Sequence, residues 1–141
     1  MSIALVRRGT LLIPSGATNH LFFVCNDPIL YPRNTKASFL AVNISSIAPN
    51  IEHDRTCVLD VGDHPFVHHP SFVFYRKAEI FGAATVGEQI AAGDIQTHAI
   101  CEEPTFARIL AGFDVSPHVT PLIRNFYRKY CLTQPEPSCA P

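Results

Sequence analysis

No apolar run in this chain approaches the roughly 18 residues that a membrane-spanning helix needs. The apolar run at residues 3–6 is short and is followed by Arg7 and Arg8, which argues against a secretory signal peptide. Tryptophan is absent, only 16% of the residues are charged, and the net charge is −1. This weak net charge argues against a protein that coats nucleic acid electrostatically, but it does not exclude a local basic groove.

Several familiar motifs are also missing. The sequence has no Walker-type phosphate loop, no GxSxG elbow, no HExxH helix and no GxGxxG fingerprint. Its five cysteines form no CxxC pair, and Cys25 and Cys57 lie in apolar runs, as small core residues do. We therefore expect a cytoplasmic protein with reduced thiols and without a cofactor.

Strand and turn chemistry dominates the first part of the chain. Twelve prolines, seven glycines and many β-branched and aromatic residues predict short strands joined by tight turns. Without helices between them, such strands favour a small barrel or sandwich. The expected strands cover residues 9–13, 20–24, 38–44, 56–59, 71–75 and 78–81, with a loop at 26–36.

The remainder of the chain favours helices, which makes the expected class mainly β with a helical part (α+β). The expected helices run from a capping box at Thr85–Glu88 to Gly93, from Glu103 to Gly112, and onward from Pro117 or Pro121. We expect a single globular domain over residues 1–131. It divides into a barrel at about 1–82 and a helical appendage at about 83–131, and residues 132–141 are a flexible tail.

The most informative stretch runs from Asp54 to Tyr75 and holds three of the seven histidines. Imidazole has the unperturbed side-chain pKa closest to neutrality, so it can exchange protons or bind a metal near pH 7. General acid–base catalysis by one of the loop histidines His64, His68 and His69 is one hypothesis, with His64 and His68 as the catalytic candidates. A purely structural role is another, in which the histidines cap a tight turn at residues 60–63 whose Gly62 has a positive φ.

The same stretch also allows a divalent metal site, because imidazole and carboxylate suit such ions. A metal-dependent hydrolase would use Asp63, His64 and His68. The further ligands within reach in the sequence are His69, His53, Asp54 and Asp60.

Three further segments hold polar groups beside expected strands. The loop at 15–20 delivers Asn19 and His20 to a strand entrance. The strand at 38–44 carries Asn43 and leads directly into Ser45 and Ser46, whose amide and hydroxyls suit a phosphate or a scissile group. Arg76 and Lys77 follow the strand at 71–75 as a small positive edge.

The order of these elements resembles that of the PemK/MazF-like toxins. The similar features are a strand opened by Gly9-Thr10, the strand HLFFVCN at 20–26, a strand ending in Ser45-Ser46, and PSFVFYRKAEI at 70–80. The resemblance covers roughly residues 9–82. It implies an SH3-like β-barrel that often dimerises, cleaves single-stranded RNA and is blocked by an antitoxin protein.

The resemblance also implies roles for individual residues. A Ser or Thr after the third strand assists catalysis in that family, and Ser45 or Ser46 matches it. The family also uses an arginine near the start of the second strand, where this chain has Asn19 and His20 instead. Histidine can act as base and as acid in RNA cleavage, so His20 with His64 or His68 would replace the missing arginine.

The sequence thus predicts a small SH3-like barrel with C-terminal helices and a toxin-like, metal-independent endoribonuclease. Its catalytic candidates are His20, Ser45, Ser46, His64 and His68, and its substrate-binding candidates are Asn19, Asn43, Arg76 and Lys77. The expected partners are single-stranded RNA, an antitoxin and a second copy of the chain, with no membrane. The alternatives are a non-catalytic module that binds protein or nucleic acid, and the metal-dependent hydrolase.

Overall fold

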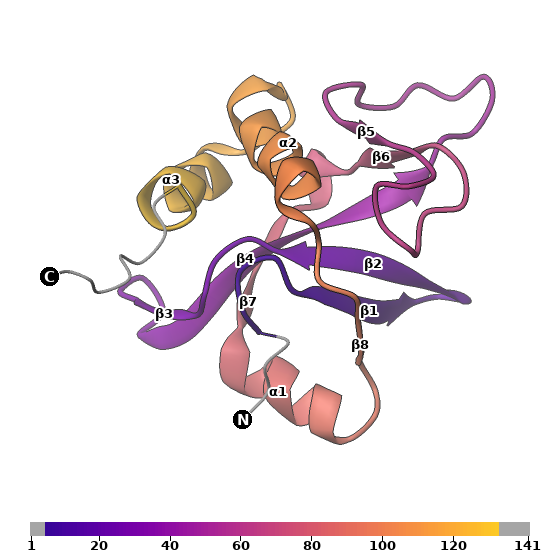
Figure 1. The fold of residues 1–141 in the computed structure, drawn as a ribbon. Coiled ribbons are helices and arrows are strands. Elements are labelled where there is room, and N and C mark those ends of the chain that lie inside the picture. Colours follow the sequence, from indigo (N-terminus) through magenta and orange to yellow (C-terminus); the bar gives the residue numbers. More distant parts are fainter. Residues whose placement is uncertain (1–4, 133–141) are drawn as a thin grey trace, which may run out of the picture.

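The computed structural model describes residues 5–132 as a mainly antiparallel sheet with three α-helices (Figure 1). The strands are β1 (Thr10–Ser15), β2 (Thr18–Val24), β3 (Ile29–Tyr31), β4 (Lys36–Ser46), β5 (Val58–Leu59), β6 (Ser71–Val73), β7 (Glu79–Gly82) and β8 (Gln96–His98). The helices are α1 (Ala83–Ala91), α2 (Glu103–Val115) and α3 (Pro121–Tyr130), with a short 3₁₀ turn at Tyr75–Lys77. The expected α+β class is confirmed.

The long strand β4 organises the sheet. It pairs with β3 and β2 and also with β7 and β6, always antiparallel. The strand order β5-β6-β4-β2-β1-β8 leaves β5 and β8 at opposite ends without a ladder between them. The closed SH3-like barrel that we expected is therefore not formed, because the two outermost strands of the described chain do not meet.

The chain beyond residue 82 contributes to the sheet as well as to the helices. β8 pairs with β1 in the register Leu11↔Thr97, so it extends the sheet that the N-terminal strands begin. This strand was not expected from the sequence, and neither was β3, which lies inside the expected loop at 26–36. Both are three-residue strands whose existence depends on a partner strand rather than on their own pattern.

Two cores lie on the two faces of the sheet, and Figure 1 shows α2 and α3 on the side opposite α1. Phe23 and Val42 pack with α2 and α3 through Ile109 and Phe126 in the larger core. The other face packs against α1 in a smaller core, and the residues central to it are Leu11, Val24, Phe39, Val86 and Ile95. The alternation of side chains along β2 and β4 explains how single strands serve both cores.

The helix boundaries differ from expectation where tertiary contacts intervene. α1 begins at Ala83 after Gly82, so Thr85 lies inside the helix and caps nothing. α2 continues past Gly112 to Val115. α3 begins at Pro121, one of the two predicted starts, and Thr120 Oγ1 accepts a hydrogen bond from Ile123 N.

Two further expectations concern the loop at 60–63 and the termini. Gly62 has a φ of 103°, as the predicted tight turn requires. No helix among residues 5–132 is long and apolar enough to cross a membrane. The tail expected at 132–141 falls, apart from Leu132, outside the described residues.

Candidate functional site

A pocket of about 340 Å³ opens where β2 and β4 separate. Their ladder ends at the pair Phe22↔Asn43. Continuing this register would set His20 opposite Ser45 and Asn19 opposite Ser46, but the strands diverge there. The loop that precedes β6 closes the remaining side with Phe66, His68 and His69. The pocket is therefore a gap between two separating strands, built from three parts of the chain that are distant in sequence.

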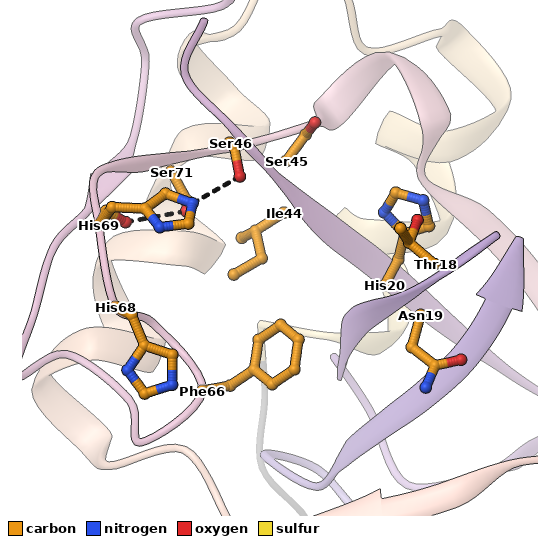
Figure 2. A pocket seen from close by; sticks show the side chains of 10 residues that line it. All are labelled: Thr18, Asn19, His20, Ile44, Ser45, Ser46, Phe66, His68, His69 and Ser71. Carbon is orange, nitrogen blue, oxygen red and sulfur yellow. Dashed lines mark hydrogen bonds between the residues drawn. The ribbon is translucent and has the colours of Figure 1, made fainter.

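Figure 2 shows the side chains that line this pocket. Five of the nine residues predicted for catalysis or substrate binding lie together here: Asn19, His20, Ser45, Ser46 and His68. The other lining residues are Thr18, Ile44, Phe66, His69 and Ser71.

His69 makes the closest polar contact in the pocket. Its Nε2 lies 2.6 Å from Ser46 Oγ, a distance typical of a strong hydrogen bond in which either group is the donor. The backbone carbonyl of His69 accepts a hydrogen bond from Ser71 Oγ at 3.1 Å, which ties the loop to the start of β6. The sequence-based interpretation left His69 out of the catalytic candidates and missed this pairing, because nothing in the local pattern brings residues 46 and 69 together.

The histidines approach the pocket from two sides. His20 comes from β2, while His68 and His69 come from the opposite loop, with Ile44 and Phe66 between them (Figure 2). The pocket lining contains no Lys, Arg, Asp or Glu, so imidazole is its sole ionisable group. Such a site can move protons between two imidazoles, but it offers no permanent charge to balance a phosphate.

His64 does not belong to this pocket. Its ring is buried, with Nε2 2.7 Å from the Ala99 carbonyl oxygen and Nδ1 accepting from Phe66 N at 3.0 Å. Burial lowers the pKa of His64, outweighing the opposite effect of the hydrogen bond to Ala99. Both ring nitrogens are thus occupied by backbone groups, and His64 pins the loop at 64–67 to the segment after β8. This placement corresponds to the structural role that the sequence left open.

The remaining substrate-binding candidates lie elsewhere. Asn43 and Lys77 line a neighbouring hollow of about 320 Å³, which also borders on His20 and Ser45. Arg76 lies in a separate cavity, where its Nη2 is 3.3 Å from His118 Nδ1. The structure thus brings Asn43 and Lys77 close to the pocket and leaves Arg76 apart from it.

The residues proposed for a metal site are engaged in other contacts. Asp63 Oδ1 pairs with Arg108 Nη1 at 3.1 Å, and both ring nitrogens of His64 contact the backbone. Within residues 5–132, no group of three or more His, Cys, Asp or Glu side chains is arranged to hold a metal ion. The geometry therefore gives the metal-dependent hydrolase no ligand set in the described chain.

Comparison with family models, with curated proteins and with solved structures finds no match to this chain.

Proposed function

We propose that this pocket cleaves single-stranded RNA by metal-independent acid–base chemistry. The observation that carries the proposal is the meeting of His20 from β2 with His68 and His69 from the opposite loop in one solvent-accessible pocket. RNA supplies its own nucleophile, the 2′-hydroxyl, so the protein needs only a base, an acid and groups that bind the phosphate. Two imidazoles on opposite sides meet the first two needs.

The reaction would proceed as an in-line transfer. One imidazole takes the proton of the 2′-hydroxyl while the 2′-oxygen attacks phosphorus, and the opposite imidazolium protonates the departing 5′-oxygen. The products are a 2′,3′-cyclic phosphate and a 5′-hydroxyl end. Asn19 and the Ser46 hydroxyl would donate hydrogen bonds to the phosphoryl oxygens, where charge accumulates in the transition state.

The hydrogen bond between Ser46 and His69 also favours a second candidate, a hydrolase with Ser46 as covalent nucleophile. A nucleophilic serine works best when a third group orients its histidine. No side chain of the described residues contacts His69 Nδ1 in this way. RNA cleavage requires no such third group, which is why it is the leading proposal.

The biological setting follows the resemblance to PemK/MazF-like toxins. In that setting the protein is cytoplasmic, where cellular RNA is found, and an antitoxin would cover the pocket mouth. The four cysteines described by the structure are free, as reduced thiols are in that compartment. The proposal also includes a homodimer, formed with a second copy of the chain.

The test is incubation of the purified protein with total cellular RNA, with and without EDTA, followed by mapping and chemical analysis of the new ends. We expect discrete, chelator-resistant cuts that leave cyclic phosphate. His20→Ala and His69→Ala should each lower the rate by about 10²-fold or more. His98→Asn is the matched control, because it removes a histidine outside the pocket and retains an acceptor for the Ala99 N–H that His98 Nδ1 now binds at 2.7 Å.

Three results would overturn the proposal. RNA left uncut would favour a non-catalytic binding module. Cuts abolished by EDTA would require a metal. Ends without cyclic phosphate, together with complete loss of activity in Ser46→Ala, would favour the covalent serine mechanism.

A further inference from the structure

The hollow beside the pocket contains a buried polar atom without a partner. Asn43 is 5% exposed, and its Oδ1 is shielded from solvent with no hydrogen-bond partner in the described chain. Its Nδ2 makes only a long contact of 3.4 Å, to the carbonyl oxygen of Ile44. That contact sets the orientation of the amide, because the reverse orientation would place two oxygens together. An unsatisfied buried acceptor is costly, so an Asn at this position suits a ligand that supplies the missing donor.

The walls of this hollow suit a flat ring. Phe22 and Phe74 flank Asn43, and the Lys77 ammonium lies 5.0 Å from the centroid of the Phe74 ring. Aromatic side chains are the usual stacking platforms for the bases of single-stranded nucleic acid. Two charged side chains line the hollow: Lys77 adds the positive charge that the catalytic pocket lacks, and Glu79 adds a carboxylate, so a bound phosphate would have to lie on the Lys77 side.

The hollow also adjoins the catalytic pocket directly. His20 and Ser45 line both spaces, and Ser45 lies on the same face of β4 as Asn43. A nucleotide chain with its scissile phosphate at His20 would therefore pass one neighbouring base over Asn43.

We propose that this hollow is a nucleobase subsite in which Asn43 selects adenine. The inference rests on the proposed cleavage of RNA and adds its sequence preference. Asn43 Oδ1 accepts from the exocyclic N6 amine of adenine while Nδ2 donates to N7, the pairing by which a carboxamide distinguishes adenine from other bases. The base displaces the Lys77 ammonium from the face of the Phe74 ring and stacks there, and Lys77 then contacts the adjoining phosphate.

The first experiment measures the sequence around the cuts in RNA. Wild-type protein should enrich adenine at one fixed position relative to the cut, by roughly tenfold over guanine. Asn43→Asp keeps an acceptor but loses the donor, so the preference should shift toward cytosine, whose N4 amine a carboxylate accepts from. Asn125→Asp makes the same chemical change on the exposed side of α3 and should leave the preference unchanged.

A second experiment separates this inference from the cleavage itself. Binding of short deoxyribose oligonucleotides, which lack the 2′-hydroxyl, is followed by fluorescence anisotropy with adenine, 7-deazaadenine or purine at the test position. Removal of N7 or of the N6 amine should weaken binding to the wild-type protein severalfold. Removal of N7 should weaken binding to the Asn43→Asp variant less than binding to wild type. Adenine-selective binding without any cleavage would sink the proposed function but keep the subsite. Cleavage with no base preference, or equal binding of all three analogues, would refute the subsite alone.

Discussion

Ser46 and His69 are 23 residues apart in the sequence, yet the Ser46 hydroxyl oxygen lies 2.6 Å from the His69 Nε2. Ser46 is the last residue of β4, and His69 lies two residues before the start of β6. The pairing Ser46↔Ser71 between β4 and β6 brings the two residues together. The side chains of both residues are exposed, so this contact adds little to folding. Its consequence is to orient an imidazole at the mouth of the pocket.

Removal of the Ser46 hydroxyl therefore separates an orienting role from a nucleophilic one. If Ser46 only positions His69, Ser46→Ala should remove the contribution of one hydrogen bond. This raises the activation free energy by about 1 kcal/mol and lowers the cleavage rate about fivefold. Ser46→Thr should restore most of the activity, and the unfolding midpoint should not move. A loss of several orders of magnitude in rate, together with ends that lack cyclic phosphate, would instead assign Ser46 as the nucleophile.

Gly112 of α2 lies directly against the Tyr75 side chain in the larger core. The Tyr75 hydroxyl donates to the Ile109 carbonyl at 2.7 Å, and a Cβ on Gly112 would overlap that hydroxyl and lie 2.9 Å from Tyr75 Cε2. Gly112→Ala should destabilise the fold by about 1–3 kcal/mol through overpacking, despite the better helix propensity of alanine.

Gly87 is the matched control for this substitution. It lies within α1, and nothing lies within 4 Å of the position that its Cβ would take. Gly87→Ala should stabilise the protein by about 0.5–1 kcal/mol. Chemical denaturation of both variants provides the measurement, and equal effects of the same sign would contradict the packing argument.

His64 should make stability depend on pH below neutrality. Its folded pKa lies below the ordinary value of 6.5, so the folded state resists protonation and the unfolded state does not. Stability is therefore full above about pH 6.5 and declines as the pH falls toward the folded pKa. The decline has a direct cause, because a proton on Nδ1 would face the Phe66 N–H that now donates to it.

Thermal unfolding between about pH 7.5 and pH 5.5 measures this effect. His64→Gln retains a donor and an acceptor but cannot titrate, so it should show a smaller loss of melting temperature across that range than wild type. Identical slopes for the two proteins would show that another group is responsible.

Ser116 joins the end of α2 to the loop before β5. It is fully buried, and its Oγ donates to Asp54 Oδ2 at 2.6 Å while accepting from His118 N at 3.1 Å. Burial alone would raise the pKa of Asp54, but hydrogen bonds from Ser116 and Thr56 outweigh it and lower the pKa.

Ser116→Ala should therefore raise the pKa of Asp54 and destabilise the fold by about 1 kcal/mol near neutral pH. A carboxyl whose pKa is lowered on folding stabilises the folded state above its unfolded pKa of 3.8, and this stabilisation is lost as the pH falls through the folded pKa. The variant lacks part of this stabilisation, so it should lose less stability than wild type on acidification. NMR titration of the Asp54 carboxyl is the measurement, and an unchanged pKa would contradict the assigned hydrogen bond. Thr120→Ala, which removes the cap of α3, serves as a destabilised control that should not affect Asp54.

The local sequence determined those features that a few neighbouring residues decide. The β-prone apolar run at 21–24 specifies β2, Thr120 and Pro121 specify the start of α3, and Gly62 specifies a turn with positive φ. Each depends on backbone preference or on a contact within one turn, so each was predictable.

Only the tertiary structure decided the rest, because long-range contacts override local signals. Gly112 looked like a helix stop but is the one residue small enough to lie against Tyr75. β8 exists because β1 offers an edge, and that same arrangement leaves the sheet open. His64 was sorted from His68 and His69 by burial, and Ser46 met His69 only through the pairing of β4 with β6. Residue type was enough to predict most of the polar residues that line the pocket. Strand register decided which of the predicted residues lie in it together.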